Sequence, residues 1–143
     1  DFKNDAIDAG ELGSNHTVTA LYEIIPTGIE SDYSVSDLKY TKTTNTANYS
    51  NELATIKFRY KKPDGDKSIE MIQTIENKSL GLKNASTNFK FSAAVAWFGL
   101  KLRDSNLVPN KETANIKKLA KEGLSNDEDG YKAEFIRLVE TVK

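Results

Sequence analysis

The sequence predicts an α+β domain in which helices cover one face of an antiparallel β-sheet. Segments with alternating apolar residues lie in the first half of the chain, and segments with helical spacing of apolar residues lie in the second half. The chain has 143 residues, of which 38% are hydrophobic, enough for one domain with a core. We therefore expect a single domain over residues 1–143, with about four N-terminal strands and about three C-terminal helices.

The first predicted strand covers residues 17–25, because apolar side chains alternate there with more polar ones, and Pro26 ends it. Its apolar positions are Val18, Ala20, Tyr22 and Ile24. Residues 27–51 are rich in Ser, Thr, Asn and Tyr, which predicts a long loop or a weak edge hairpin. Within this loop only residues 36–41 have the character of a short strand.

A β-hairpin is predicted to follow, from a strand over 53–61 to a strand over 68–76. Ala54, Ile56, Phe58 and Tyr60 occupy alternate positions of its first strand. The turn signal is Pro-Asp-Gly at 63–65, in which we expect Gly65 to take the positive φ.

The central element is a predicted helix over residues 88–104, with Ser86 or Thr87 as its N-cap. Its expected apolar face consists of Phe91, Ala94, Val95, Phe98 and Leu102, flanked by Ala93, Trp97 and Leu100. A helix that is apolar over so much of its circumference needs cover on more than one side.

Two further helices are expected. One is capped by Asn110 and ends at Gly123, and its apolar set is small, so it should lie half exposed. That set is Ala114, Ile116, Leu119 and Ala120. The last helix starts from about Asp127, with Ser125 and Glu128 in capping-box spacing. Its expected stripe is Tyr131, Phe135, Leu138, Val139 and Val142.

Composition excludes several classes of function. With 20 basic and 21 acidic residues the net charge is -1, which gives no overall attraction to nucleic acid. The absence of cysteine excludes disulfides and thiolate ligands. No apolar run has the length that spans a bilayer, so we expect no membrane insertion by this domain. The start at Asp1 is typical of a cut inside a longer chain.

Asp5, Asp8, Glu11 and His16 have the side chains of a cation site, but their spacing matches no known ligand loop. Solvated turn acids are the simpler interpretation. His16 with Ser14 does not form a recognisable nucleophile motif either. We predict no enzyme activity, no catalytic, cofactor-binding or metal-binding residues, and no cofactor.

Tyr33, Tyr40 and Tyr49 lie in the polar loop, where aromatic faces beside Asn and Asp suit a glycan. Local packing is the more common use of such tyrosines. A basic edge follows the hairpin, and interleaved acids at Asp64, Asp66 and Glu70 are expected to neutralise most of it. The edge consists of Lys57, Arg59, Lys61, Lys62 and Lys67.

Three stretches together resemble one family: DAGELGSNHTVTALYEIIP, ELATIKFRYKKPDGDKS, and FKFSAAVAWFGLKLRDS with the closing GYKAEFIRLVE. They are similar to the C-terminal domain that follows a von Willebrand factor type A domain in a group of bacterial, often exported proteins, the YfbK-like group. The resemblance implies a non-enzymatic accessory domain, with an upstream von Willebrand domain and an unknown protein as partners. It also implies an extracytoplasmic location, in the periplasm or at the cell surface. A glycan- or cation-binding module is the alternative.

Asp32, Ser34 and Ser36 spell the D-x-S-x-S motif of the von Willebrand adhesion site. Such a loop follows a fully apolar central strand and opens a helix in a doubly wound fold. The preceding residues are not such a strand, so we interpret this match as accidental.

Overall fold

The computed structural model describes residues 3–6, 10–26, 29, 49 and 51–142, which fold into strands followed by helices. The elements are β1 (Glu52–Tyr60), β2 (Ile69–Glu76), the 3-10 helix η1 (Leu82–Asn84), α1 (Thr87–Leu102), α2 (Thr113–Glu122) and α3 (Tyr131–Thr141). The predicted α+β class, with an antiparallel sheet before three helices, is confirmed.

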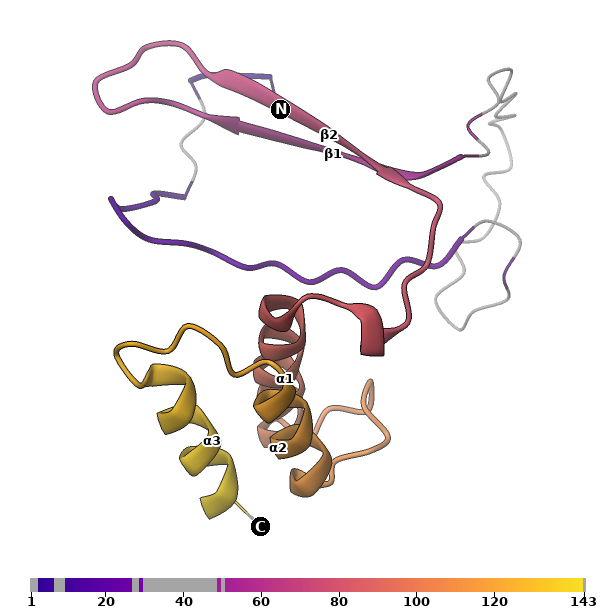
Figure 1. The fold of residues 1–143 in the computed structure, drawn as a ribbon. Helices are drawn as coiled ribbons and strands as arrows, with labels where there is room; N and C mark the ends of the chain where they lie inside the picture. Colours follow the sequence, from indigo (N-terminus) through magenta and orange to yellow (C-terminus); the bar gives the residue numbers. More distant parts are fainter. Residues whose placement is uncertain (1–2, 7–9, 27–28, 30–48, 50, 143) are drawn as a thin grey trace. The chain divides into compact units, whose positions relative to one another are not determined.

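The chain forms two compact units, each of which we describe by itself. The first combines Asp1–Thr17 with Glu23–Ser79, and the second combines Val18–Tyr22 with Leu80–Lys143. The first contains the β1–β2 hairpin, and the second contains the three α-helices (Figure 1). A single domain with helices covering the sheet stays a prediction.

The predicted hairpin is confirmed, and in its antiparallel register Phe58 lies opposite Met71. A bulge interrupts the ladder between Glu52 and Ala54. In the connecting turn the Gly65 N–H donates to the Lys62 carbonyl at 2.9 Å. The predicted positive φ at Gly65 is wrong, because Asp64 takes it, at 59°. Pro63 followed by a positive φ matches a type II turn, and Asp tolerates that conformation better than most residues.

The described residues form a two-stranded sheet, so the prediction of about four strands is not confirmed. Residues 17–25 are described and carry no strand pairing, and Val18 and Tyr22 are 79% and 81% exposed. An alternating pattern of apolar side chains is compatible with a β-strand, but it does not show whether another strand is available to pair with it. The other predicted strand, over 36–41, lies outside the described residues.

The core of the helical unit lies where α2 meets its two neighbours. The buried apolar residues are Ala94 and Phe98 of α1, Ile116, Leu119 and Ala120 of α2, and Ile136 and Val139 of α3. Helix α2 contacts both α1 and α3. The prediction that α2 lies half exposed is confirmed, since Ile116, Leu119 and Ala120 are buried on its inner face whereas Ala114 is exposed.

Helix α1 begins as predicted, with Ser86 as the N-cap accepting a hydrogen bond from the Phe89 N–H at 3.2 Å. Its buried stripe differs from the expected one. Val95 and Leu102 are 42% and 59% exposed, whereas Ala94 and Phe98 are buried. Because α1 is apolar around most of its circumference, the pattern alone could not show which side meets the other helices.

Helix α3 begins later than predicted and by another cap. The Asp127 carboxylate accepts hydrogen bonds from the N–H groups of Lys132 at 2.8 Å and Ala133 at 2.9 Å. The predicted Ser125 and Glu128 capping box is wrong, since the Ser125 hydroxyl donates to Thr87 Oγ1 instead. Negative charge at this position also suits the positive end of the helix.

The expected stripe of α3 is wrong in part. Tyr131 and Leu138 are 77% and 53% exposed, and Ile136, which the stripe omitted, is buried. Phe135 packs against two aromatic side chains of α1, with ring centroids 5.4 Å from Phe91 and 5.6 Å from Phe98. Edge-to-face contacts of this kind add to the burial of the rings.

Helix α2 ends as predicted, with Gly123 as its C-cap, but its start differs. Asn110 does not cap it, and the helix begins at Thr113. The Asn110 side chain instead accepts from the Glu112 N–H at 3.0 Å, while its backbone carbonyl accepts from Trp97 Nε1 at 2.7 Å. The α1–α2 connection is thereby tied to the only tryptophan of the chain.

Gly123 and Gly99 give a matched pair for testing the contact between α2 and α1. A Cβ on Gly123 would lie 2.5 Å from the Phe91 nitrogen, whereas a Cβ on Gly99 would meet nothing within 4 Å. We expect Gly123→Ala to destabilise the domain by about 2 kcal/mol or more, and Gly99→Ala to stabilise it by roughly 0.5–1 kcal/mol. Urea unfolding of both variants checks the ranking, and equal midpoints would contradict the close approach.

Trp97 is the second test of the helical unit. It is partly buried against both core clusters and makes the Asn110 hydrogen bond. Trp97→Ala is expected to cost about 3 kcal/mol, near the lower end for a large aromatic side chain. Tyr49→Ala should be nearly silent, since Tyr49 is 58% exposed. Thermal melts with the opposite ranking would show that α1 does not organise the fold.

Candidate functional site

The β1–β2 hairpin has one face built from apolar side chains, which we call the hairpin apolar face. Its members are Ala54, Ile56, Phe58 and Tyr60 of β1 and Ile69, Met71 and Ile75 of β2, with Gln73 as the polar exception. Their register places Phe58 opposite Met71 and Tyr60 opposite Ile69. The Phe58 and Tyr60 rings stack along the strand with centroids 6.3 Å apart.

The hairpin apolar face is accessible in the structure. Phe58, Met71 and Ile56 are 54%, 57% and 51% exposed. The opposite face is mainly polar, with Thr55 opposite Thr74 and Arg59 opposite Glu70. A contiguous apolar surface on an otherwise polar element is typical of a site that binds another protein surface.

On the polar face, Asp5 of the N-terminal segment is held by both ends of the hairpin turn. Arg59 Nη2 donates to Asp5 Oδ1 at 2.8 Å, and the Ser68 N–H donates to Asp5 Oδ2 at 3.3 Å. The Ser68 hydroxyl also donates to Asp5 Oδ1. Lys61 Nζ donates to the Asp5 backbone carbonyl at 2.6 Å. We call Asp5, Arg59, Lys61 and Ser68 the Asp5 clasp.

These contacts lower the pKa of Asp5 below its ordinary value. The Ser68 hydroxyl hydrogen bond is the largest cause and the Ser68 backbone N–H the next. Desolvation opposes the shift by less than the Ser68 hydrogen bonds, and the positive charges of Arg59 and Lys61 are smaller causes that also lower the pKa. The carboxylate is therefore held in its charged form by donors that point at both of its oxygens.

The acidic residues considered as cation ligands are not brought together. Asp5 belongs to the clasp, so its interpretation as a solvated turn acid is wrong. Asp8 lies outside the described residues. Glu11 is exposed, and His16 is exposed with its Nδ1 3.1 Å from the Ser14 carbonyl. In the described part of the chain, no three His, Asp or Glu side chains are grouped as a metal site would require.

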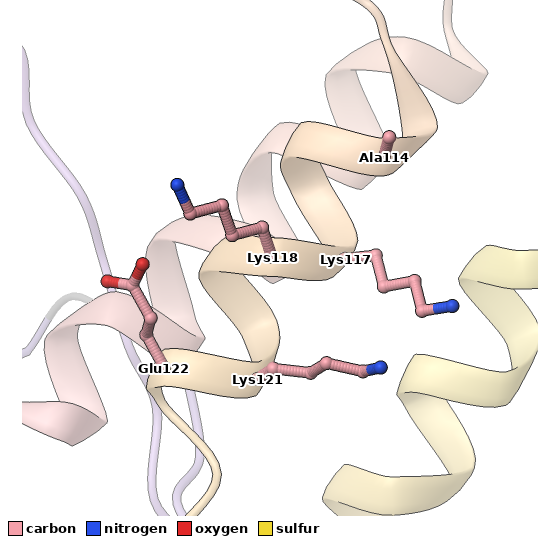
Figure 2. A pocket seen from close by; sticks show the side chains of 5 residues that line it. All are labelled: Ala114, Lys117, Lys118, Lys121 and Glu122. Carbon is pink, nitrogen blue, oxygen red and sulfur yellow. The ribbon is translucent and has the colours of Figure 1, made fainter.

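A second surface feature is an open hollow along α2 (Figure 2). Its lining residues are Ala114, Lys117, Lys118, Lys121 and Glu122. Lys117 and Lys121 extend toward α3, whereas Lys118 and Glu122 point to the other side of α2. The hollow is therefore lined by one helix rather than enclosed between elements.

The charges around this hollow are largely paired within the helical unit. Lys117 forms an ion pair with Glu140 of α3, and this contact lowers the pKa of Glu140. Glu122 lies 3.7 Å from Lys90 of α1, measured between Oε2 and Nζ. These pairs join α2 to both neighbouring helices, so we interpret them as structural rather than as a ligand site.

The other residues considered from the sequence contribute little to a site. Tyr33, Tyr40 and the D-x-S-x-S match at Asp32, Ser34 and Ser36 lie outside the described residues. Tyr49 is exposed. For the basic edge, the sequence indicated neutralisation by nearby acids, but Asp5 contacts Arg59 from 54 positions away. No local pattern could have revealed this partner.

The described residues thus define an α+β module with an amphipathic hairpin and a three-helix unit. Over residues 1–143 the chain matches the family described as "Uncharacterized protein YfbK, C-terminal", and it belongs to that family. This confirms the resemblance drawn from the sequence. The chain is 37% identical over 142 residues to "Uncharacterized protein YfbK" of Escherichia coli (strain K12).

The matched region is 97% of this chain but 24% of that relative, so the chain spans about a quarter of the relative's length. No solved structure matches the chain. Among the helices of the described residues, none has the length and apolar character needed to cross a membrane.

Asp5→Asn tests the clasp through its pH dependence. Because the pKa of Asp5 is lowered in the folded chain, its contribution to stability is fully present above the unfolded pKa. That contribution is lost as pH falls through the lowered folded value. We expect Asp5→Asn to weaken hydrogen-exchange protection of the hairpin amides at neutral pH, and the difference from the unmodified chain to vanish in strong acid.

The matched control is Glu11→Gln, which removes a charge from an exposed carboxylate of the same segment. It should leave the protection of the hairpin unchanged at both pH values. If Asp5→Asn also had no effect at neutral pH, the Asp5 clasp would not contribute to the stability of the hairpin.

Proposed function

We propose that this domain is a non-enzymatic accessory and protein-interaction domain of a longer bacterial protein. Its family consists of C-terminal regions, and the relative in Escherichia coli is about four times as long as the matched region, which supports a role beside other domains. In this proposal a von Willebrand factor type A domain lies upstream and is one partner. The longer protein faces the cell envelope, outside the cytoplasm.

The observation that carries the proposal is the exposed hairpin apolar face. A two-stranded hairpin is only marginally stable by itself, and it gains stability when its apolar face packs against another surface. Burial of side chains such as Phe58 and Met71 contributes about 25 cal/mol per Å² of apolar area removed from water. A protein surface supplies such area, whereas a sugar or a hydrated cation supplies little.

The four-stranded sheet is part of the same proposal. Residues 17–25 and 36–41 carry the alternating pattern of strands, and a sheet larger than the hairpin would present a broader apolar surface. The alternative of a glycan- or cation-binding module gains no support from Tyr49 or from Glu11 and His16, which are exposed and lie in no group of ligands within the described chain.

Ile56→Lys and Thr55→Lys form a matched pair for testing the proposal. The two residues are neighbours in β1, both are exposed, and only Ile56 belongs to the hairpin apolar face. We expect Ile56→Lys to weaken binding of the domain to the separately produced von Willebrand domain by about tenfold or more, since a buried Ile contributes about 1.5–3 kcal/mol. Thr55→Lys should bind as the unmodified domain does. Isothermal titration calorimetry measures both.

Two outcomes would contradict the proposal. Equal binding by both variants would show that the hairpin apolar face does not contact the partner. Unfolding of the domain by Ile56→Lys, with Thr55→Lys folded, would show that this face belongs to the domain's own core rather than to an interface.

A further inference from the structure

The donors of the Asp5 clasp occupy backbone positions that the hairpin itself brings together. Arg59 belongs to β1, Lys61 follows β1, and Ser68 immediately precedes β2. The ladder ends with Tyr60 opposite Ile69, which brings these three residues to the same end of the hairpin. The hairpin register therefore positions the donors, and Asp5 comes to them from 54 to 63 positions earlier in the chain.

The donors match the two oxygens of a carboxylate. Asp5 Oδ1 accepts from Arg59 Nη2 and from the Ser68 hydroxyl, and Asp5 Oδ2 accepts from the Ser68 N–H. Each of these hydrogen bonds is charge-assisted because the carboxylate is ionised, and Arg59 also brings a positive charge. The Lys61 ammonium donates a hydrogen bond to the backbone carbonyl of Asp5, so it contacts the peptide backbone next to the carboxylate.

Other charges face the same side of the hairpin. Glu70 lies opposite Arg59 in the register, and Lys57 lies two residues before Arg59 on the same face. Glu70 offsets part of the positive potential that Lys57, Arg59 and Lys61 produce there. The side chain of Asp5 is 34% exposed, so its position can be reached from solvent.

We propose that Arg59, Lys61 and Ser68 form a binding site for the carboxylate of an acidic segment in a partner protein, and that Asp5 occupies this site as an intramolecular ligand. Release of the N-terminal segment opens the site, and its return closes it. This inference rests on the proposed protein-interaction function and names the chemistry that the partner presents on the polar side of the hairpin.

Because Asp5 competes with an external carboxylate, only a ligand with sufficient affinity can occupy the site. A ligand tethered in the same chain is present at the site at an effective concentration set by its tether, whatever the concentration of the protein. An external ligand must bind tightly enough to displace Asp5. A single carboxylate does this poorly, whereas an acidic segment that makes further contacts does it better. The partner is therefore one that also binds elsewhere on the domain.

The experiment uses the full chain and sodium acetate as the probe, with sodium chloride added to keep the ionic strength constant. Asp5→Ala removes the intramolecular ligand. We expect acetate to shift the Ser68 amide and the Arg59 Nε–Hε resonances saturably in Asp5→Ala, with an apparent affinity at least about tenfold tighter than in the unmodified chain. The double variant Asp5→Ala with Ser68→Ala should lose this response.

A second measurement keeps the test decisive if Asp5→Ala disorders the hairpin. In the unmodified chain, high acetate should displace Asp5, so that the Asp5 side-chain carbon and the Ala6 amide shift with the same midpoint as Ser68. Equal, non-saturating responses in both chains, or an Asp5 that does not move, would overturn the inference.

Inorganic phosphate separates the two kinds of anion. Tighter binding of phosphate than of acetate by Asp5→Ala would assign the site to phosphate groups and overturn the carboxylate assignment. Because acetate is read at Ser68 and Arg59 without any partner, failure here is distinct from failure of the Ile56→Lys test on the hairpin apolar face.

Discussion

The helical unit depends on the backbone and side-chain contacts of one residue, Phe91. Its backbone lies so close to Gly123 that a Cβ there would be 2.5 Å from the Phe91 nitrogen. Its ring meets Phe135 of α3 edge to face and lies 5.4 Å from the Lys132 ammonium. Phe91 therefore holds together the start of α1, the end of α2 and the start of α3. This close packing explains why the inner face of α2 is buried.

The sequence predicted the elements of the fold better than their contacts. The hairpin and the three helices follow from local periods and turn residues, which are properties of neighbouring positions. The buried side of α1 did not follow, because Val95 is as apolar as Ala94 and only the other helices decide between them. The cap of α3 was missed because Asp127 reaches Lys132 and Ala133 over five and six positions, beyond the capping-box spacing.

The candidate site depends even more on contacts between residues that are distant in the sequence, which local patterns do not predict. The alternation in β1 correctly grouped Ile56, Phe58 and Tyr60 on one face. The Asp5 clasp joins residues 54 to 63 positions apart, and the acidic residues beside Asp5 suggested a cation instead. The hairpin consequently carries two surfaces of opposite chemistry, one apolar and one built from charged donors, which suits a module that recognises proteins through more than one kind of contact.

Side chains along β1 alternate between its two faces, and this alternation limits where the domain can accept insertions. A residue inserted between Ala54 and Tyr60 would exchange the two faces of β1 beyond that point, bringing Arg59 to the apolar side and Phe58 to the side of the clasp. Residues added between Lys61 and Ser68 leave both strands in phase and the clasp residues next to their strands, and the bulge before Ala54 already absorbs an extra residue at the other end. Length changes are thus tolerable at the two ends of the hairpin and harmful within its strands, so descendants of this chain can change loop length freely while keeping both surfaces.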